Sequence, residues 1–212
     1  EAQAEALAAK EKVLQVQNTL MRELDHRVKN SLAMISSLLR MQASGSDKEQ
    51  VKDELHDAAN RVLTISRVHE RLYQGCDVSS VSLKTYVEPL CTEIRDALAS
   101  DGFELVFDLP NEFISSDMAV ALGLIVYELL SNALRHGFAD RDTGRIEVTF
   151  DGDDRTFVFT VADNGRGLPN GFAIEGASGL GMKIVSLYAT QLGGVLEHMP
   201  NDNGGARFTV TV

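Results

Sequence analysis

Apolar positions in the first 43 residues recur at intervals of seven and predict one long amphipathic helix. The segment is rich in Ala, Glu, Lys, Leu and Gln and contains no Pro or Gly, a composition that favours helix. The resulting heptad seam is typical of a coiled coil, although Lys10, Gln17 and Ser31 interrupt it. Its apolar members are Leu7, Leu14, Met21, Val28 and Ile35, with Leu24 and Leu38 at the complementary positions.

A second apolar stripe predicts another long helix, from about residue 47 to residue 74. The polar segment 44–47 breaks the first helix, and Gly75 ends the second. Two long helices joined by a short turn form a hairpin, whose open apolar face needs a partner. We therefore expect residues 1–76 to form a helical hairpin that completes a four-helix bundle as a homodimer. A monomer is the alternative, because polar residues interrupt the seam.

From residue 77 onward the pattern changes to helices interleaved with short strands. Alternation and turn residues predict helices over 82–99, 117–136 and 180–192, and strands over 103–107, 145–150, 156–162, 195–199 and 206–212. Elements in this order predict an α/β sandwich, in which helices cover one face of an antiparallel sheet. The fold class is therefore α+β, with one domain at 1–76 and a second at 77–212.

Charge and composition narrow the classes of function. Hydrophobic residues make up 44% of the chain and charged residues 24%, with a formal net charge of −11. No cluster of Lys and Arg is longer than two residues, so we expect no nucleic-acid partner. The two cysteines, Cys76 and Cys91, lack metal-ligand spacing and are too few for a disulfide framework, which favours a reducing cytoplasm.

Targeting and membrane signals are not evident. We find no signal peptide and no apolar run near the roughly 18 residues that a membrane-spanning helix needs. The chain begins inside a helical pattern, so we expect a sensor domain upstream of it.

His26 is the first candidate for chemistry. At 100° per residue it lies about 160° from the middle of the apolar arc on its helix, so its ring faces solvent and can act as a nucleophile. Asp25 or Glu23 could orient this ring or take its proton. An ordinary surface histidine has the same position, so geometry alone does not decide between the two readings. His56 and His198 belong to no motif.

Three further motifs follow in order along the second domain. Glu128 and Asn132 lie four residues apart on one helix face, so they could bind Mg²⁺ or position a proton acceptor. Arg135 and His136 could contact phosphate. The motif 163–167 (Asp-Asn-Gly-Arg-Gly) follows a strand, where a carboxylate can accept a hydrogen bond from an adenine amino group. The motif 179–183 (Gly-Leu-Gly-Met-Lys) opens a helix whose N–H groups can bind phosphate. Each motif taken singly also has an ordinary structural interpretation: the first as a solvated helix face, the second as a simple turn, and Lys183 of the third as a surface residue.

The residues around His26 change the balance of these readings. The string Glu-Leu-Asp-His-Arg-Val-Lys-Asn at 23–30 resembles the phosphoacceptor box of the histidine-kinase branch that includes the HWE kinases. The string Arg-Val-His-Glu-Arg-Leu-Tyr at 67–73 is similar to the second helix of that branch. The chain has no Trp, so the W-x-E signature is absent and the resemblance is to a sister group.

The three later motifs resemble the N, G1 and G2 boxes of the GHKL, or Bergerat, ATP-binding fold, over about residues 80–212. The resemblance implies ATP and Mg²⁺ as cofactors, with Asn132 as Mg²⁺ ligand, Glu128 as the N-box acid and a second candidate ligand, and Asp163 as the adenine reader. It also implies that 168–178 is a mobile ATP lid. The implied ATP-binding residues are Asn132, Arg135, His136, Asp163, Gly165, Gly167, Leu168, Ser178, Gly179, Leu180, Gly181, Met182 and Lys183.

Together the two resemblances imply a kinase that phosphorylates its own His26 and passes the phosphoryl group to an Asp of a response regulator receiver domain. Asp25 is then the candidate base, because Arg27 stands where the family usually has an acid. Gly205-Ala206 also replaces a Gly-Thr pair common near the last strand. The rival readings are a GHKL ATPase without a phosphoacceptor and a dimerisation or phosphotransfer scaffold with a decayed ATP site.

Overall fold

The computed structural model describes residues 2–73, 80–99, 102–169, 171–174, 176, 179–201 and 204–212. In the first helix, the side chains described before residue 26 are those of Lys12, Thr19, Glu23 and Leu24 only, and those of 67–73 in the second helix are likewise outside the description. The chain divides into two compact units, Glu1–Asp77 and Val78–Val212. The first is helical and the second is built around a sheet, which confirms the predicted α+β class.

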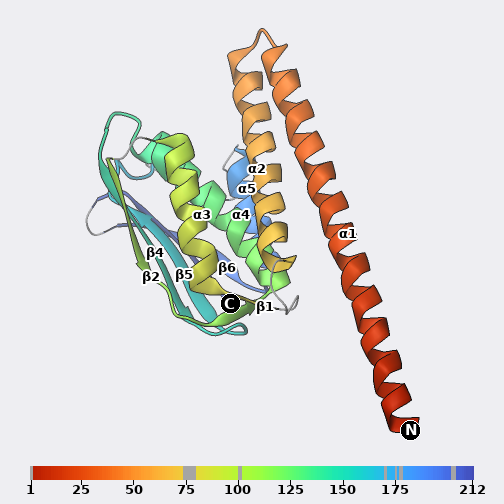
Figure 1. The fold of residues 1–212 in the computed structure, drawn as a ribbon. Coiled ribbons are helices and arrows are strands. Elements are labelled where there is room, and N and C mark those ends of the chain that lie inside the picture. The colour runs from red at the N-terminus through yellow and green to blue at the C-terminus, as the bar shows by residue number, and fades with distance from the viewer. Residues whose placement is uncertain are drawn as a thin grey trace. The chain divides into compact units, whose positions relative to one another are not determined.

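The first unit is a helical hairpin of α1 (Ala2–Ser44) and α2 (Glu49–Tyr73), drawn in red and orange in Figure 1. Small side chains form the described interface: Ser36, Ala43 and Ala59 are at most 3% exposed. The Ser36 hydroxyl donates to the Ala59 carbonyl at 3.2 Å, and Arg40 donates to the Asn60 side chain at 2.9 Å. Small residues at these positions let the two backbones approach closely.

Four large apolar side chains of α1 lie on a second face, which we call the outer stripe. It consists of Leu24, Val28, Ile35 and Leu38, which are 57%, 38%, 46% and 52% exposed. At 100° per residue the outer stripe is centred about 100° from Ser36 and Ala43. From Leu24 to Leu38, the apolar seam predicted from the sequence is therefore on the surface of this chain, and the described part of the hairpin leaves it uncovered.

The second unit contains a five-stranded sheet in the order β2-β4-β5-β7-β6. The strands are β2 (Phe103–Asp108), β4 (Gly144–Gly152), β5 (Phe157–Asp163), β6 (Val195–Pro200) and β7 (Ala206–Thr211). The prediction of an antiparallel sheet is wrong at one place, because β2 pairs with β4 in parallel, with Phe103 opposite Gly144. The chain between these strands passes through a long helix, and such a crossover is what brings two strands side by side in the same direction.

Two strands were absent from the prediction. β1 (Ser80–Ser82) and β3 (Phe113–Ser115) pair antiparallel in a small separate sheet. With three residues each, they are too short to show an alternating pattern in the sequence.

Helices α3 (Leu83–Leu98), α4 (Ser116–Asn132) and α5 (Leu180–Gln191) cover one face of the five-stranded sheet (Figure 1). Alternate residues of β4 point toward them: Ile146, Val148 and Phe150 are buried. The middle of α4 is buried on all sides, from Ala121 to Ser131. This helix is therefore the centre of the core, and it carries the motif that begins at Glu128.

The expectation of no membrane-length apolar helix needs correction. Among the described residues, Ser116–Gly137 is long and apolar enough, by length and composition, to cross a membrane, and 83% of an 18-residue part of it is buried within the protein. The helical prediction 117–136 also changes at its end, because Ala133–Gly137 forms a π-helical turn after α4. Such turns occur frequently at functional sites.

Candidate functional site

The end of α4 and the π-helical turn present one face to a cavity of about 650 Å³. Leu129, Asn132, Ala133, His136 and Gly137 line it. These positions follow the spacing i, i+3, i+4, i+7 and i+8, so they form a single helical face. Residues on the neighbouring face do not reach the cavity, even where they are close in sequence.

Loops and strand ends form the rest of the cavity. The segment after β5 contributes most of them, and α5 and β7 close the opposite side. These further lining residues are Asp163, Arg166, Gly167, Leu168, Pro169, Phe172, Gly176, Gly179, Met182, Ala206 and Phe208. Apolar side chains predominate among them, and Asp163 is the one carboxylate in the lining that the structure describes. A mainly apolar cavity with few polar groups suits a planar organic ring.

Asp163 ends β5 and is only 7% exposed. Its Oδ1 accepts hydrogen bonds from the backbone N–H of Gly165 at 2.8 Å and of Ala206 at 3.3 Å. Burial raises the pKa of Asp163 above its ordinary value, and these two N–H groups partly oppose that rise. The carboxylate is thus oriented through one oxygen, which leaves Oδ2 as the atom suited to a ligand amino group.

Glycines make this close arrangement around Asp163 sterically possible. A Cβ on Gly205, whose φ is +82°, would lie 2.1 Å from the Asp163 carbonyl oxygen. A Cβ on Gly165 would lie 2.4 Å from the Gly137 carbonyl oxygen. Both positions therefore need glycine, because any side chain would push the backbone away from Asp163.

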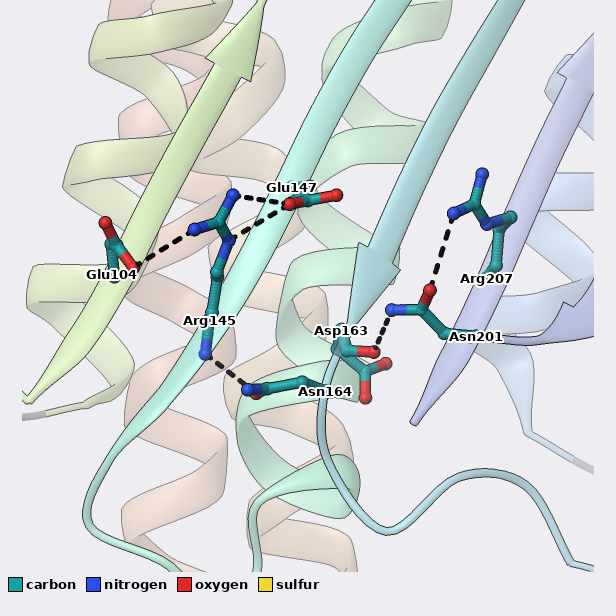
Figure 2. Close-up of polar contacts among 7 residues, drawn as sticks. All are labelled: Glu104, Arg145, Glu147, Asp163, Asn164, Asn201 and Arg207. Atoms are coloured by element: carbon teal, nitrogen blue, oxygen red, sulfur yellow. Dashed lines mark hydrogen bonds and ion pairs between the residues drawn. The ribbon is translucent and has the colours of Figure 1, made fainter. Parts of the chain in front are cut away.

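Polar side chains hold the loops on either side of Asp163, as Figure 2 shows. Asn201 donates to the Asp163 carbonyl oxygen at 2.8 Å, and Arg207 donates to the Asn201 side chain at 3.4 Å. On the other side, the Asn164 side chain accepts from the backbone N–H of Arg145 at 2.8 Å. The turn after β5 is thus joined to β4 and to the loop between β6 and β7.

The guanidinium of Arg145 is not available to a ligand in the cavity. It pairs with Glu147 at 2.6 Å and with Glu104 at 3.8 Å across β2 and β4 (Figure 2). Among the described residues that line the cavity, the cationic or imidazole side chains are His136 and Arg166.

The structure brings together seven of the residues predicted for the site. These cavity-lining residues are Asn132, His136, Asp163, Gly167, Leu168, Gly179 and Met182. Other predicted residues lie outside the lining. Glu128 is buried at 3% exposure, Arg135 lies on the neighbouring helical face, and Gly165 is buried behind Asp163. Leu180, Gly181 and Lys183 also do not line the cavity, and Ser178 lies outside the described residues.

Several lining residues were missed by sequence reasoning. Phe172, Ala206 and Phe208 meet the end of α4 only through the tertiary fold. Arg166 lies inside the 163–167 motif between two predicted glycines, so its place in the motif was a usable signal. The Gly205-Ala206 pair replaces the common Gly-Thr pair, and the Ala206 backbone N–H donates to Asp163 Oδ1 there.

The other candidate, His26, lies on α1 and is exposed, as its helical position predicts. One turn before it, Glu23 forms an ion pair with Arg27 at 2.8 Å. The Asp25 side chain lies outside the described part of α1. Of the two acids considered beside His26, Glu23 is therefore already engaged by a cation.

The residues of the cavity fit Mg²⁺ only as an ion that accompanies a phosphate ligand. In the part of the chain that the structure describes, no three His, Cys, Asp or Glu side chains form a metal-binding group. Asn132 lines the cavity, and its Nδ2 contacts Met182 Sδ at 3.5 Å, so its amide oxygen is the atom suited to the ion. Mg²⁺ usually keeps several waters and binds substrate phosphates beside few protein ligands, so Asn132 would supply one ligand and the phosphates and waters the rest.

Two family models match the chain, one in its N-terminal half and one in its C-terminal half. A family described as "Histidine kinase" matches residues 23–98, and one described as "Histidine kinase-, DNA gyrase B-, and HSP90-like ATPase" matches residues 118–212. The first match contains His26, and the second contains the whole cavity lining.

Individual relatives carry the same description. The chain is 31% identical over 206 residues to "Sensor histidine kinase PdtaS" of Mycolicibacterium smegmatis, covering 96% of this chain and 41% of the relative. It is 29% identical over 185 residues to "Blue-light-activated histidine kinase 2" of Erythrobacter litoralis, covering 82% of this chain and 51% of the relative. The chain thus spans about half or less of the length of these relatives.

Solved structures extend the comparison to the fold. The histidine kinase domain of a blue-light activated histidine kinase from Erythrobacter litoralis aligns with a TM-score of 0.67 and 25% identity. The alignment covers 92% of this chain and 91% of that domain.

Proposed function

This chain belongs to the histidine kinases and contains their GHKL-type core, and on that premise we propose that it transfers the γ-phosphoryl group of ATP to His26. The observation that carries the proposal is the buried, oriented Asp163 in a cavity with apolar walls, on a chain that also exposes His26. Neither feature alone would distinguish a kinase from an ATPase.

In the proposed complex the adenine ring lies between the apolar walls, and its amino group donates to Asp163 Oδ2. Met182 and Leu168 supply part of those walls, and Asn132 faces the same cavity. Asn132 would hold Mg²⁺, which neutralises phosphate charge when it is bound. Because the chain carries a net charge of −11, this local neutralisation is needed for a polyanionic substrate.

At His26 an unprotonated ring nitrogen attacks the γ-phosphorus, and the bond between that phosphorus and the bridging oxygen of ADP breaks. The proton on the other ring nitrogen passes to a base. Glu23 is held by Arg27 at 2.8 Å, so we assign this role to Asp25, the residue directly before His26 in sequence. The phosphohistidine then donates to an aspartate of a response regulator receiver domain.

The outer stripe supports a homodimer. Ile35 and Leu38 are 46% and 52% exposed on a helix that the hairpin leaves uncovered, and a second copy would bury them in a four-helix bundle. His26 lies about 160° from the centre of the outer stripe, so dimerisation would leave it accessible. Sedimentation should show that Ile35→Glu is monomeric while the matched exposed control Ser37→Glu stays dimeric; a wild-type monomer would remove this part of the proposal.

We further propose that a sensor domain precedes this core and that the core acts in the cytoplasm, where ATP and response regulators are found. The relatives are about twice as long or longer, which leaves room in such a protein for a sensor domain beside the core.

The test is incubation with ATP labelled at the γ-phosphate. A histidine kinase yields labelled protein whose label is lost in acid and kept in base, and a receiver domain then removes it. Steady phosphate release without labelled protein would favour the ATPase, and calorimetry with a non-hydrolysable ATP analogue that detects no binding would favour the scaffold with a decayed site.

A further inference from the structure

His198 lies on β6 and belongs to no sequence motif, yet its ring is part of an aromatic cluster beside the nucleotide cavity. It stands directly opposite Phe208 in the register of β6 and β7, and the two ring centroids are 6.3 Å apart. Phe208 lines the cavity, whereas His198 does not. The pairing of the two strands therefore sets both rings on the same side of the sheet.

Phe172 completes the cluster from the loop after β5. Its ring meets His198 edge-on, with centroids 5.1 Å apart and planes at 80°, and it meets Phe208 at 6.3 Å and 82°. Both distances and both angles are favourable for aromatic pairs. Phe172 also lines the cavity, so its ring forms part of the cavity wall and is in contact with the rings of His198 and Phe208.

In the described part of the loop, 171–174 and 176, the backbone contact of Phe172 is local. Its backbone N–H donates to the Pro169 carbonyl at 3.0 Å, which closes a local turn. Gly171, inside that turn, has a φ of +78° and would have no atom within 4 Å of an added Cβ. Among the described residues, the aromatic contacts that orient the Phe172 ring are therefore those with His198 and Phe208.

We propose that His198 is a positioning residue of the nucleotide site: its ring holds Phe172 against Phe208 and so shapes the wall that receives the purine base. This inference rests on the proposed function, because it assumes that a nucleotide occupies the cavity. His198 acts through Phe172 and does not touch the ligand. Since the wall contacts the base, loss of the wall lowers the affinities for adenosine, ADP and ATP by the same factor.

The test is a double-mutant cycle with calorimetric dissociation constants for adenosine, ADP and a non-hydrolysable ATP analogue. His198→Ala and Phe172→Ala should each raise the dissociation constants of all three ligands roughly two- to ten-fold, the range expected for the loss of one aromatic pair. The double variant should bind about as weakly as Phe172→Ala, because the two residues act as a unit. His198→Phe should restore binding to within about two-fold of wild type.

Met199→Ala is the matched control, because Met199 is the next residue on β6, is 52% exposed and faces away from the cluster. It should bind all three ligands like wild type. Unchanged affinity in His198→Ala, additive effects in the double variant, or a loss confined to the phosphorylated ligands would overturn the inference. If His198→Ala does not fold, His198→Leu takes its place in the cycle, since Leu fills the space without an aromatic ring. Wild-type protein that binds none of the ligands would instead refute the proposed function.

Discussion

Replacing Asp163 by Asn should abolish most nucleotide binding without harming the fold. Asp163 Oδ1 accepts from the N–H groups of Gly165 at 2.8 Å and Ala206 at 3.3 Å. The single oxygen of Asn can keep both contacts, and its NH₂ group then takes the place of Oδ2. An adenine amino group approaching that position meets a donor in place of an acceptor.

The size of the effect follows from the burial of the site. A hydrogen bond to a charged group contributes about 1.5–3 kcal/mol. Its loss corresponds to a rise in the dissociation constant of about 10- to 150-fold. Because Asp163 is 7% exposed, solvent cannot replace the lost acceptor, so we expect the upper part of this range.

Stability should change in the opposite direction. Burial raises the pKa of Asp163, so the ionised carboxylate disfavours the folded state at neutral pH. Asn removes that charge, and the unfolding temperature should be equal to or higher than that of wild type. Calorimetry with ADP and thermal unfolding measure the two quantities, with exposed Asp151→Asn as the control. Tight ADP binding by Asp163→Asn would refute the adenine assignment, and a large fall in unfolding temperature would refute the account of the buried charge.

Three other results are expected. ADP affinity should fall as the pH is lowered through the raised pKa of Asp163, because protonation removes the acceptor; titration at several pH values checks this, and a flat profile would contradict it. Gly205→Ala should lower the free energy of unfolding in urea by more than Gly193→Ala does. Both glycines have φ near +80°, so Gly193→Ala should cost about 1–2 kcal/mol, but only at Gly205 does the added Cβ lie within 4 Å of other atoms. Equal losses in the two variants would contradict the steric argument. In a Cys76→Ser background, Cys91 should react with a maleimide only as the protein unfolds, because burial raises the pKa of its thiol; rapid labelling of the native protein would contradict this.

The sequence predicted the elements with strong periodicity. The two long helices and the strands with buried alternate residues, such as Ile146 and Val148 in β4, follow directly from their apolar patterns. What it missed depends on contacts between distant segments. The parallel direction of β2 depends on how the chain crosses the sheet, and the π-helical turn at Ala133–Gly137 changes the backbone without an apolar signature.

The site shows the same division. Asp163 could be predicted because its motif is local, whereas Phe172 and Phe208 line the cavity only after segments 36 residues apart meet. The heptad seam was read correctly as apolar, but the sequence pattern did not reveal that small residues such as Ser36 and Ala43 would form the hairpin interface in its place. Burial of the small residues therefore decides which face of α1 stays open.

The location of the phosphoryl group after incubation with ATP tests the central proposal most directly. Wild-type protein and the variant His26→Gln, which keeps a polar exposed side chain, are each incubated with γ-labelled ATP, and the label is located on peptides kept at alkaline pH. We predict acid-labile label on the peptide that contains His26, and none in His26→Gln although ADP binding there equals that of wild type. Label that persists in His26→Gln, or that lies on another residue of the wild-type chain, would contradict the assignment of His26 as the phosphoacceptor.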